Sequence, residues 1–400
     1  MEAAAKAILK IDKANWTPVK FGDVVFEPKE NAKDIYNEGI EHVVGLEHIE
    51  AENIHLTQSG KLEESTTFSK KFKKGDVLFG RRRAYLKKAA LASFDGICSG
   101  DITVFRAKKN LLPKLLPFIV NNEKFFDYAV KHSAGGLSPR VKFKDLANYE
   151  FLLPPKDQQA QLAELLWAMD EVIEKTESIR GLLYTIRKTI LKDLFNLNWS
   201  SGSPFFNTFS IEDFNLLEFS QICSESMFGP RFSSKYYNEK GGIACLRTTD
   251  IDEEGNINVR TMPHAKLPEG KFKEHYLRIN DILISRSGTC GLTAVFNGYE
   301  LPVLPAAFII RFRLKEEINP NYIKTFFNSE YGKTITNSLA SGAVQKNLTS
   351  KALLKVKIPI PKKSIQDQII IMLENLGLEE SEIKISSSRA LQKSLINQIF

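Results

Sequence analysis

The longest regular pattern of apolar positions lies between Pro154 and Phe195. Pro154 and Pro155 mark the start of a helix, because proline is tolerated in a first helical turn but not inside a helix. Apolar residues then recur at alternating spacings of three and four, which is the heptad pattern of a helix that pairs with another helix. Roughly 40 residues of helix would span about 60 Å. The predicted seam consists of Leu162, Leu165, Met169, Val172, Ile179, Leu183, Ile186 and Ile190, and a second row of Leu166, Ile173 and Leu194 widens it.

The same pattern returns near the other end of the chain. Pro361 and Gln366 repeat the spacing of Pro154 and Gln159. The predicted pairing residues of this second helix are Ile369, Met372, Leu376 and Ile383. The outward face of the first helix is charged along its length, so pairing with a second helix is favoured over burial in one globular core.

The repeat extends backwards from both helices. The segment 74–81 aligns with 279–286, and Gly135-Gly136 aligns with Gly342-Ala343. A period near half the chain is too long for a solenoid and indicates two copies of one domain, each followed by a long helix. The sequence therefore predicts an α+β protein with an internal repeat. Its predicted parts are domain one (1–153), a spacer helix with linker (154–199), domain two (200–360) and a second spacer helix (361–400).

Composition places the chain among globular proteins with a basic balance. Apolar residues make up 43% of the chain, enough to build cores. A net charge of +7 and a pI near 8.9 indicate a polyanionic partner, although a mild cationic excess alone is a weak signal. The four scattered cysteines contain no Cys-x-x-Cys and are typical of reduced thiols in the cytoplasm. We expect no signal segment and no membrane-spanning run.

A basic cluster follows the predicted strand Val77–Phe79. Arginines and a tyrosine on a glycine-started loop offer phosphate pairing, guanine contacts and a stacking surface at one place. A solvated charge run is the common alternative, and the position after a strand favours function. The glycine-rich segment from Gly135 could equally be a plain turn, although its second copy favours a nucleic-acid role. The candidate DNA-contacting residues of domain one are Lys74, Gly80, Arg81, Arg82, Arg83, Tyr85, Lys87, Gly135, Gly136, Arg140 and Lys142.

Domain two carries different residues at the equivalent places. Arg286 follows the predicted strand 281–285 as Arg81 follows its counterpart, but the next residues are serine and glycine. Equivalent scaffolds that carry different loops would recognise different sequences. The candidate DNA-contacting residues of domain two are Arg231, Lys235, Arg286, Ser287, Gly288, Gln345 and Lys346.

The order of domain, proline–glutamine helix, domain and proline–glutamine helix resembles the specificity subunit of type I restriction-modification enzymes over essentially the whole chain. The resemblance implies two target-recognition domains that each bind one half of a bipartite double-stranded DNA site. It also implies two antiparallel helices that form a coiled coil, an approximate twofold relation between the repeats, and docking of modification (methyltransferase) and restriction subunits. S-adenosylmethionine, ATP and Mg²⁺ would then belong to the partner subunits and not to this chain.

No catalytic or metal site is evident in the sequence. Leu153-Pro154-Pro155-Lys156 lacks the flanks of a base-methylation motif, and no phosphate-binding Gly-Lys-Ser/Thr loop occurs. His42, His48 and His55 have spacings that favour structural histidines over metal ligands. Two alternatives stay open at this point: a DNA-modifying nuclease or methyltransferase with an unrecognised site, and a coiled-coil scaffold that does not bind DNA.

Overall fold

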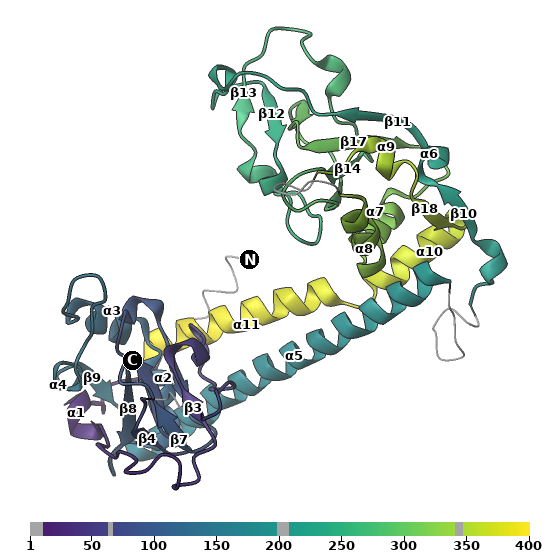
Figure 1. The fold of residues 1–400 in the computed structure, drawn as a ribbon. Helices are drawn as coiled ribbons and strands as arrows, with labels where there is room; N and C mark the ends of the chain where they lie inside the picture. The colour runs from purple at the N-terminus through teal and green to yellow at the C-terminus, as the bar shows by residue number, and fades with distance from the viewer. Residues whose placement is uncertain (1–10, 63–66, 198–207, 341–346) are drawn as a thin grey trace. The chain divides into compact units, whose positions relative to one another are not determined.

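The computed structural model describes residues 11–62, 67–197, 208–340 and 347–400 (Figure 1). They form two compact units: unit 1 comprises residues 1–178 and 380–400, and unit 2 comprises residues 179–379. Two helices, α5 (Lys156–Asn196) and α11 (Leu378–Ile399), contribute to both units. No helix in the described ranges is both long enough and apolar enough to cross a membrane.

Unit 1 is built from small sheets packed against short helices. The sheet orders are β2-β8-β5-β6, β3-β7-β4 and β1-β9, and pairing is antiparallel except between β3 and β7. The strands are β1 (Thr17–Lys20), β2 (Val25–Phe26), β3 (Val43–Val44), β4 (Lys70–Phe72), β5 (Val77–Gly80), β6 (Ala89–Leu91), β7 (Gly96–Cys98), β8 (Ile102–Ala107) and β9 (Glu150–Leu153). The helices are α1 (Phe21–Val24), α2 (Leu116–Val120), α3 (Glu123–Lys131) and α4 (Phe143–Leu146).

Unit 2 repeats most of this topology. Its sheet orders are β11-β17-β14-β15, β13-β12-β16 and β10-β18; the four-stranded and two-stranded sheets match those of unit 1 and confirm the predicted internal repeat. In the three-stranded sheet the parallel pair β12-β16 corresponds to β3-β7, but the third strand differs: β13 pairs with β12, whereas β4 pairs with β7. The strands are β10 (Asn215–Glu218), β11 (Cys223–Phe228), β12 (Ile243–Leu246), β13 (His264–Ala265), β14 (Ile282–Ser285), β15 (Thr293–Val295), β16 (Val303–Pro305), β17 (Ile309–Leu314) and β18 (Lys357–Ile360). The helices are α6 (Phe219–Ile222), α7 (Pro320–Asn328), α8 (Glu330–Leu339), α9 (Ser350–Leu353) and α10 (Lys363–Glu374).

A buried glutamine explains the repeated proline–glutamine motif. The Gln159 side chain is 2% exposed; its Nε2 donates to the carbonyls of Pro154 (2.9 Å) and Asn110 (3.1 Å), and its Oε1 accepts from the amide of Leu112 (2.8 Å). The side chain thereby ties the first turn of α5 to the segment before α2.

The second copy makes the same connection. Gln366 Nε2 donates to the carbonyl of Pro361 (2.8 Å), and Gln366 Oε1 accepts from the amide of Asn319 (2.8 Å). Asn319 is the N-cap residue of α7, so this glutamine ties α10 to the start of α7. We call the two side chains the glutamine clips.

The buried face of α5 in unit 1 differs by one position from the predicted seam. Ala163, Leu166, Asp170 and Ile173 are all buried, and these positions follow a heptad spacing of their own. Leu166 and Ile173 form the predicted second row, and both are buried. Asp170 is absent from that prediction, because an isolated carboxylate is costly to bury. Here Asp170 Oδ2 accepts a hydrogen bond from His55 Nε2 at 2.6 Å.

The outcome for the predicted seam is therefore mixed. Leu165, Val172, Ile179 and Ile186 are 41–53% exposed and Ile383 is 58% exposed. The prediction that these five side chains are buried between paired helices is therefore wrong. Of the others, Ile190 and Ile369 are buried in the core of unit 2, while Leu162, Met169, Leu183, Met372 and Leu376 are half-buried.

Within unit 1, α11 packs antiparallel to the first half of α5. The Arg389 guanidinium pairs with Glu177, and Gln392 Nε2 donates to the carbonyl of Leu166. Sequence numbers rise along one helix as they fall along the other. The C-terminal segment is not one continuous helix as predicted, because α10 ends at Glu374 and α11 begins at Leu378, with Gly377 between them at a φ of +68°.

Candidate nucleic-acid interface

Two segments that the sequence analysis treated separately meet in unit 1. The residues after β5, 81–83, lie beside the glycine-rich segment 134–141, and we call them the first loop pair. The amide of Arg83 donates to the carbonyl of Pro139 (2.8 Å), and the amide of Val141 donates to the carbonyl of Arg81 (3.0 Å). An additional bridge between Ala134 and Arg140 closes the glycine-rich segment on itself. The fold therefore presents both basic segments at one place.

Asp101 organises the side chains of the first loop pair. Its carboxylate accepts from Arg140 Nε at 2.7 Å and from Arg82 Nη1 at 3.2 Å. Partial burial raises the pKa of Asp101, but hydrogen bonds and charge from Arg140 and Arg82 outweigh burial and hold the pKa below its usual range. Arg82 also donates to Ser138 Oγ at 3.1 Å. Arg82 therefore has a structural role, and sequence reasoning missed Asp101 because nothing in its neighbourhood distinguishes it from other acidic residues.

The outer rim of the first loop pair is exposed. Arg83 has a φ of +54° and is exposed, and its side chain has no hydrogen bond or ion pair within the described residues. Leu137 at the tip of the glycine-rich segment is 98% exposed, and Tyr85 is 54% exposed. A free guanidinium beside exposed apolar and aromatic side chains suits contact with phosphates and bases.

Unit 2 holds an equivalent second loop pair, formed by residues 286–288 and 347–348. The amide of Leu348 donates to the carbonyl of Arg286 (2.8 Å), as Val141 does to Arg81, and a bridge joins Ser287 to Asn347, as one joins Arg82 to Arg140. The backbone is thus repeated while the side chains differ. Arg286 Nε donates to Asn347 Oδ1 at 3.1 Å, whereas its counterpart Arg81 donates from Nε to the carbonyl of Val141.

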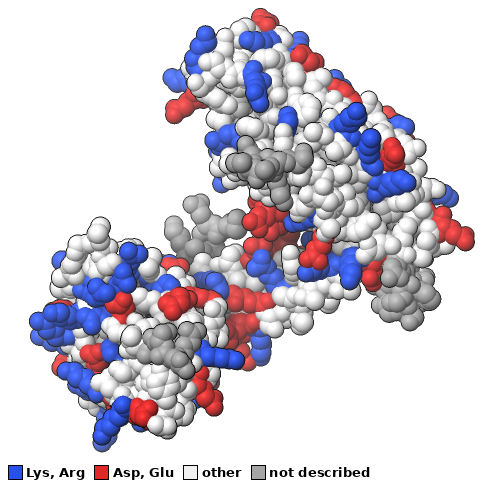
Figure 2. Space-filling view, viewed as in Figure 1, with Lys and Arg blue, Asp and Glu red and all other residues white. Residues whose placement is uncertain are grey.

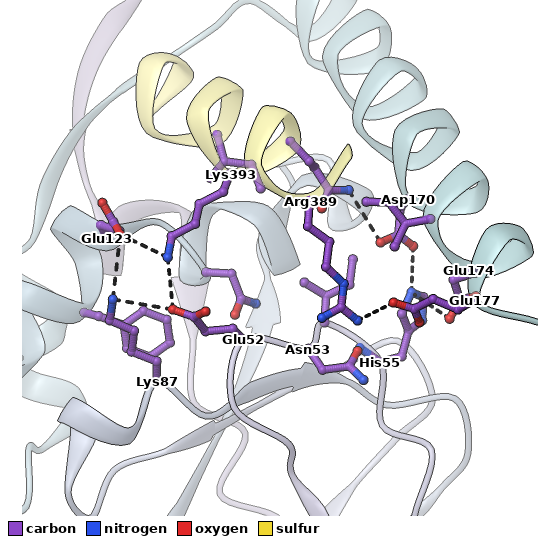
Figure 3. Close-up of a pocket in the computed structure, with 16 residues that line it drawn as sticks. Glu52, Asn53, His55, Lys87, Glu123, Asp170, Glu174, Glu177, Arg389 and Lys393 are labelled. Carbon is purple, nitrogen blue, oxygen red and sulfur yellow. Dashed lines mark hydrogen bonds and ion pairs between the residues drawn. The ribbon is translucent and has the colours of Figure 1, made fainter. Parts of the chain in front are cut away.

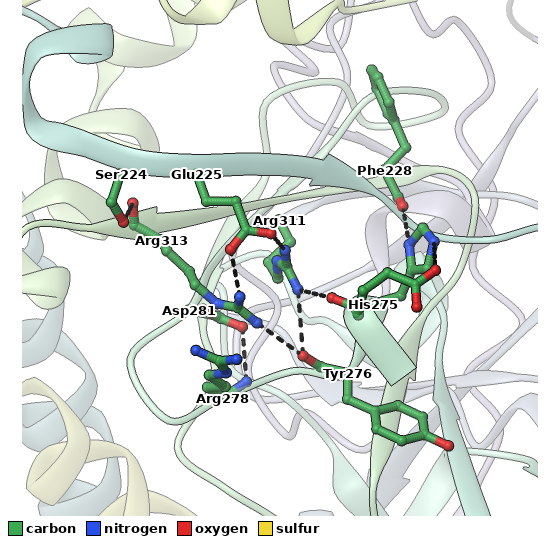
Figure 4. Close-up of polar contacts among 10 residues, drawn as sticks. Ser224, Glu225, Phe228, His275, Tyr276, Arg278, Asp281, Arg311 and Arg313 are labelled. Atoms are coloured by element: carbon green, nitrogen blue, oxygen red, sulfur yellow. Dashed lines mark hydrogen bonds and ion pairs between the residues drawn. The ribbon is translucent and has the colours of Figure 1, made fainter. Parts of the chain in front are cut away.

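Arginine–aspartate pairs hold the strands that carry both loop pairs. Arg106 Nε on β8 donates to Asp76 Oδ1 at 2.6 Å, and Arg313 Nε on β17 donates to Asp281 Oδ1 at 3.2 Å. Unit 2 adds the buried Arg311, which shares Glu225 with Arg313 and donates to the carbonyl of Glu274 at 2.9 Å (Figure 4). Asp76 and Asp281 lie just before β5 and β14, so these pairs fix the strands that end at the loops.

Other predicted DNA-contacting residues have different surroundings. Gly80 is buried, and an added Cβ would lie 3.0 Å from the Leu46 side chain, which indicates a packing role. Lys74 lies at the opposite end of β5 from Arg81, so the structure does not bring these residues together. Gly135, with a φ of +117°, and Gly136 are exposed in the first loop pair, and Lys142 is exposed at its edge.

The remaining predictions concern unit 2. Gly288, exposed with a φ of +77°, lies in the second loop pair. Arg231 and Lys235 are exposed, and Lys235 Nζ lies 5.3 Å from the centre of the Tyr236 ring. Gln345 and Lys346 lie outside the described residues. In Figure 2 basic side chains are visible on the surface of both units, interspersed with acidic ones.

Lys87 belongs to a different group, which we call the anchor cluster: Glu52, His55, Lys87, Glu123, Asp170, Glu174, Arg389 and Lys393. These residues line a pocket in unit 1 between the segment 52–55, α5 and α11 (Figure 3). Lys87 and Lys393 each pair with both Glu52 and Glu123, at 3.0–3.7 Å. The network connects the domain to both helices. Lys87, predicted as a DNA contact, is instead engaged in these ion pairs.

His55 is the central titratable group of the anchor cluster. Its Nε2 lies 2.6 Å from Asp170 and 3.5 Å from Glu174. The hydrogen bond to Asp170 raises the pKa of His55 despite partial burial, and nearby carboxylates add to the effect. The three side chains have ligand atoms within 4.8 Å of one another, the spacing of a metal site, but in this structure they form an ion-paired group next to Arg389 and Lys393.

Comparison with known families accounts for this architecture. The family model described as the type I restriction modification DNA specificity domain matches the chain twice, over residues 13–182 and 211–388. The chain belongs to this family. Each match contains one loop pair and one glutamine clip, which are the features repeated between the two units.

Relatives of this specificity chain match it along most of its length. It is 24% identical to the type I restriction enzyme MjaVIII specificity subunit of Methanocaldococcus jannaschii, over 76% of this chain and 75% of that protein. It is also 24% identical to the EcoKI specificity subunit of Escherichia coli K12, over 75% of this chain and 65% of that protein.

Solved structures agree with the fold. A type I restriction-modification S subunit from M. genitalium superposes with a TM-score of 0.59 at 15% identity, covering 98% of both chains. A chain from a study of complex assembly and conformational transition in the type I system superposes with a TM-score of 0.58 at 20% identity, covering 96% of both chains. The specificity chain therefore shares the fold of these proteins.

Proposed function

We propose that the chain recognises a bipartite double-stranded DNA target, with one loop pair at each half. The observation that supports this proposal most directly is the repeated loop pair, in which both units share one backbone hydrogen bond and one bridge but carry different side chains. Equal scaffolds with unequal side chains suit two half-sites of different sequence, because base contacts carry the specificity and scaffold contacts set position.

The chain also offers a surface for protein partners. Leu165 and Val172 on α5 of unit 1 are exposed apolar side chains at heptad spacing, and α11 does not cover them. Apolar side chains in such a row suit an added helix. We assign this row to a modification subunit, and the restriction subunit would join through the same assembly.

Catalysis would belong to those partners. S-adenosylmethionine, ATP and Mg²⁺ are accordingly proposed as cofactors of the modification and restriction subunits, acting on DNA in the cytoplasm. The nuclease, methyltransferase and scaffold alternatives are not favoured by the family match, which names a DNA specificity domain.

Co-expression with a cognate modification subunit, followed by sequencing of methylated genomic sites, tests the proposal. The expected result is methylation at one two-part sequence with a fixed gap. Methylation at the same sites by the modification subunit alone would show that this chain is not needed to recognise the target. Salt-independent DNA binding would also count against it, because phosphate contacts make affinity fall with salt.

A further inference from the structure

Arg286 is held in one place by its backbone. It is the first residue after β14; its amide donates to the carbonyl of Phe308 (2.9 Å), and its carbonyl accepts from the amide of Leu348 (2.8 Å). Contacts from both sides leave the start of the side chain little freedom. The question is then what orients the guanidinium at its end.

Two side chains orient the guanidinium of Arg286. Its Cζ lies 4.7 Å from the centre of the Phe228 ring, and its Nε donates to Asn347 Oδ1 at 3.1 Å. The aromatic contact supports one face of the group, and the hydrogen bond fixes its rotation. Within the described part of the chain, Nη1 and Nη2 have no hydrogen bond or ion pair, so their donors remain available to a ligand.

Phe228 is itself fixed in position. It pairs with Ile310 at the end of β11, and its carbonyl accepts from His275 Nδ1 at 2.9 Å (Figure 4). The next residue, Gly229, packs so tightly that an added Cβ would lie 2.1 Å from the carbonyl oxygen of Ala306. The backbone that carries the ring supporting Arg286 is therefore held in place by the sheet.

An oriented guanidinium with two free amino groups matches one ligand in particular. The O6 and N7 acceptors of guanine lie side by side in the major groove, and arginine binds both at once. A phosphate contact does not require a fixed plane, since lysine serves it as a point charge. We infer that Arg286 recognises a guanine of the half-site bound by unit 2; this inference rests on the proposed function.

The first loop pair does not carry the same device. Arg81, the counterpart of Arg286, donates from Nε to the carbonyl of Val141 at 3.1 Å. Within the described residues, its guanidinium makes no cation–π contact with an aromatic ring. Arg82 and Arg140 are engaged by Asp101. The guanine assignment is therefore confined to the half-site of unit 2.

The test uses the assembled complex with its modification subunit and duplexes that carry the methylated target. Each guanine of the half-site is replaced in turn by 7-deazaguanine, which lacks N7, or by inosine, which keeps N7 and O6. At one guanine we expect 7-deazaguanine to weaken binding by about tenfold or more, the loss for a hydrogen bond to a charged group. Inosine should leave the major-groove contact intact.

An Arg286 variant links the effect to this side chain. Arg286→Ala should weaken binding of the native target and no longer distinguish 7-deazaguanine from guanine at that position. The control is Arg278→Ala, which removes an exposed arginine four residues before the start of β14, on the side away from Arg286, and should keep the distinction.

Three results would overturn the inference while leaving the proposed function in place. The half-site of unit 2 could lack guanine. The variant could keep full sensitivity to 7-deazaguanine. Alternatively, Arg286→Ala could weaken all DNA sequences equally and reduce the log–log salt slope by about one, which is the signature of a phosphate contact. Absence of any sequence-specific binding by the assembled complex would instead refute the proposed function.

Discussion

Removal of a glutamine clip should destabilise the domain–helix junction far more than removal of an exposed glutamine. In Gln159→Ala, the carbonyl of Pro154, the carbonyl of Asn110 and the amide of Leu112 lose their partner. An unsatisfied buried polar group costs about 1–3 kcal/mol. The Pro154 contact is fully buried and the other two are partly accessible to water. We therefore expect a total loss of roughly 2–4 kcal/mol in the free energy of unfolding.

Denaturant unfolding combined with hydrogen exchange measures this effect. Gln161→Ala, an exposed position on the same helix, is the matched control and should change stability by less than about 0.5 kcal/mol. In Gln159→Ala, exchange should accelerate at the start of α5 and at Leu112. A loss no larger than that of Gln161→Ala would refute the argument that the clip joins the two elements.

Three further variants test other parts of the molecule. Arg83→Ala should weaken DNA binding and reduce the log–log salt slope by about one, measured by fluorescence anisotropy, whereas an unchanged slope would exclude a phosphate contact. Because the folded-state pKa of His55 is raised, its stabilisation is complete below about pH 6.5 and is lost as the pH rises through the folded-state value; the unfolding midpoint of His55→Gln should lack this dependence. Val172→Glu should reduce co-purification of the modification subunit, while Ser178→Glu, exposed about 120° around α5 from Val172, should not.

Much of the architecture could be predicted because the sequence contains an internal repeat. The spacing of Pro154 and Gln159 recurs at Pro361 and Gln366, and a repeated local pattern indicates a repeated structure. The way the glutamines join two elements could not be predicted, because the partners in the second element, such as Leu112 and Asn319, lie 47 residues away in the sequence.

The helix pairing was harder to predict because polar residues occupy the buried face. Leu166 and Ile173 of the buried row were identified, but Asp170 and Glu177 stand at heptad positions of the same row. A pattern of apolar residues passes over these two, so the main seam was placed at Leu165 and Val172. His55, Arg389 and Gln392, which come from distant segments of the chain, supply hydrogen bonds to these carboxylates.

The interface was predicted in part. The arginines after β5 and the glycine-rich segment were both identified, but their meeting depends on long-range contacts. Arg81 and Arg82 bond to Val141 and Asp101, whereas the Arg83 side chain stays exposed. No local sequence pattern connects Val141 or Asp101 to these arginines.

The central claim is that each unit recognises its own half of the DNA target. The most direct measurement replaces residues 211–360 with the corresponding segment of a relative of different specificity and sequences the methylated sites after co-expression with the modification subunit. We predict that one half of the two-part sequence changes while the other half stays the same. A change in both halves, or an unaltered target, would contradict the account.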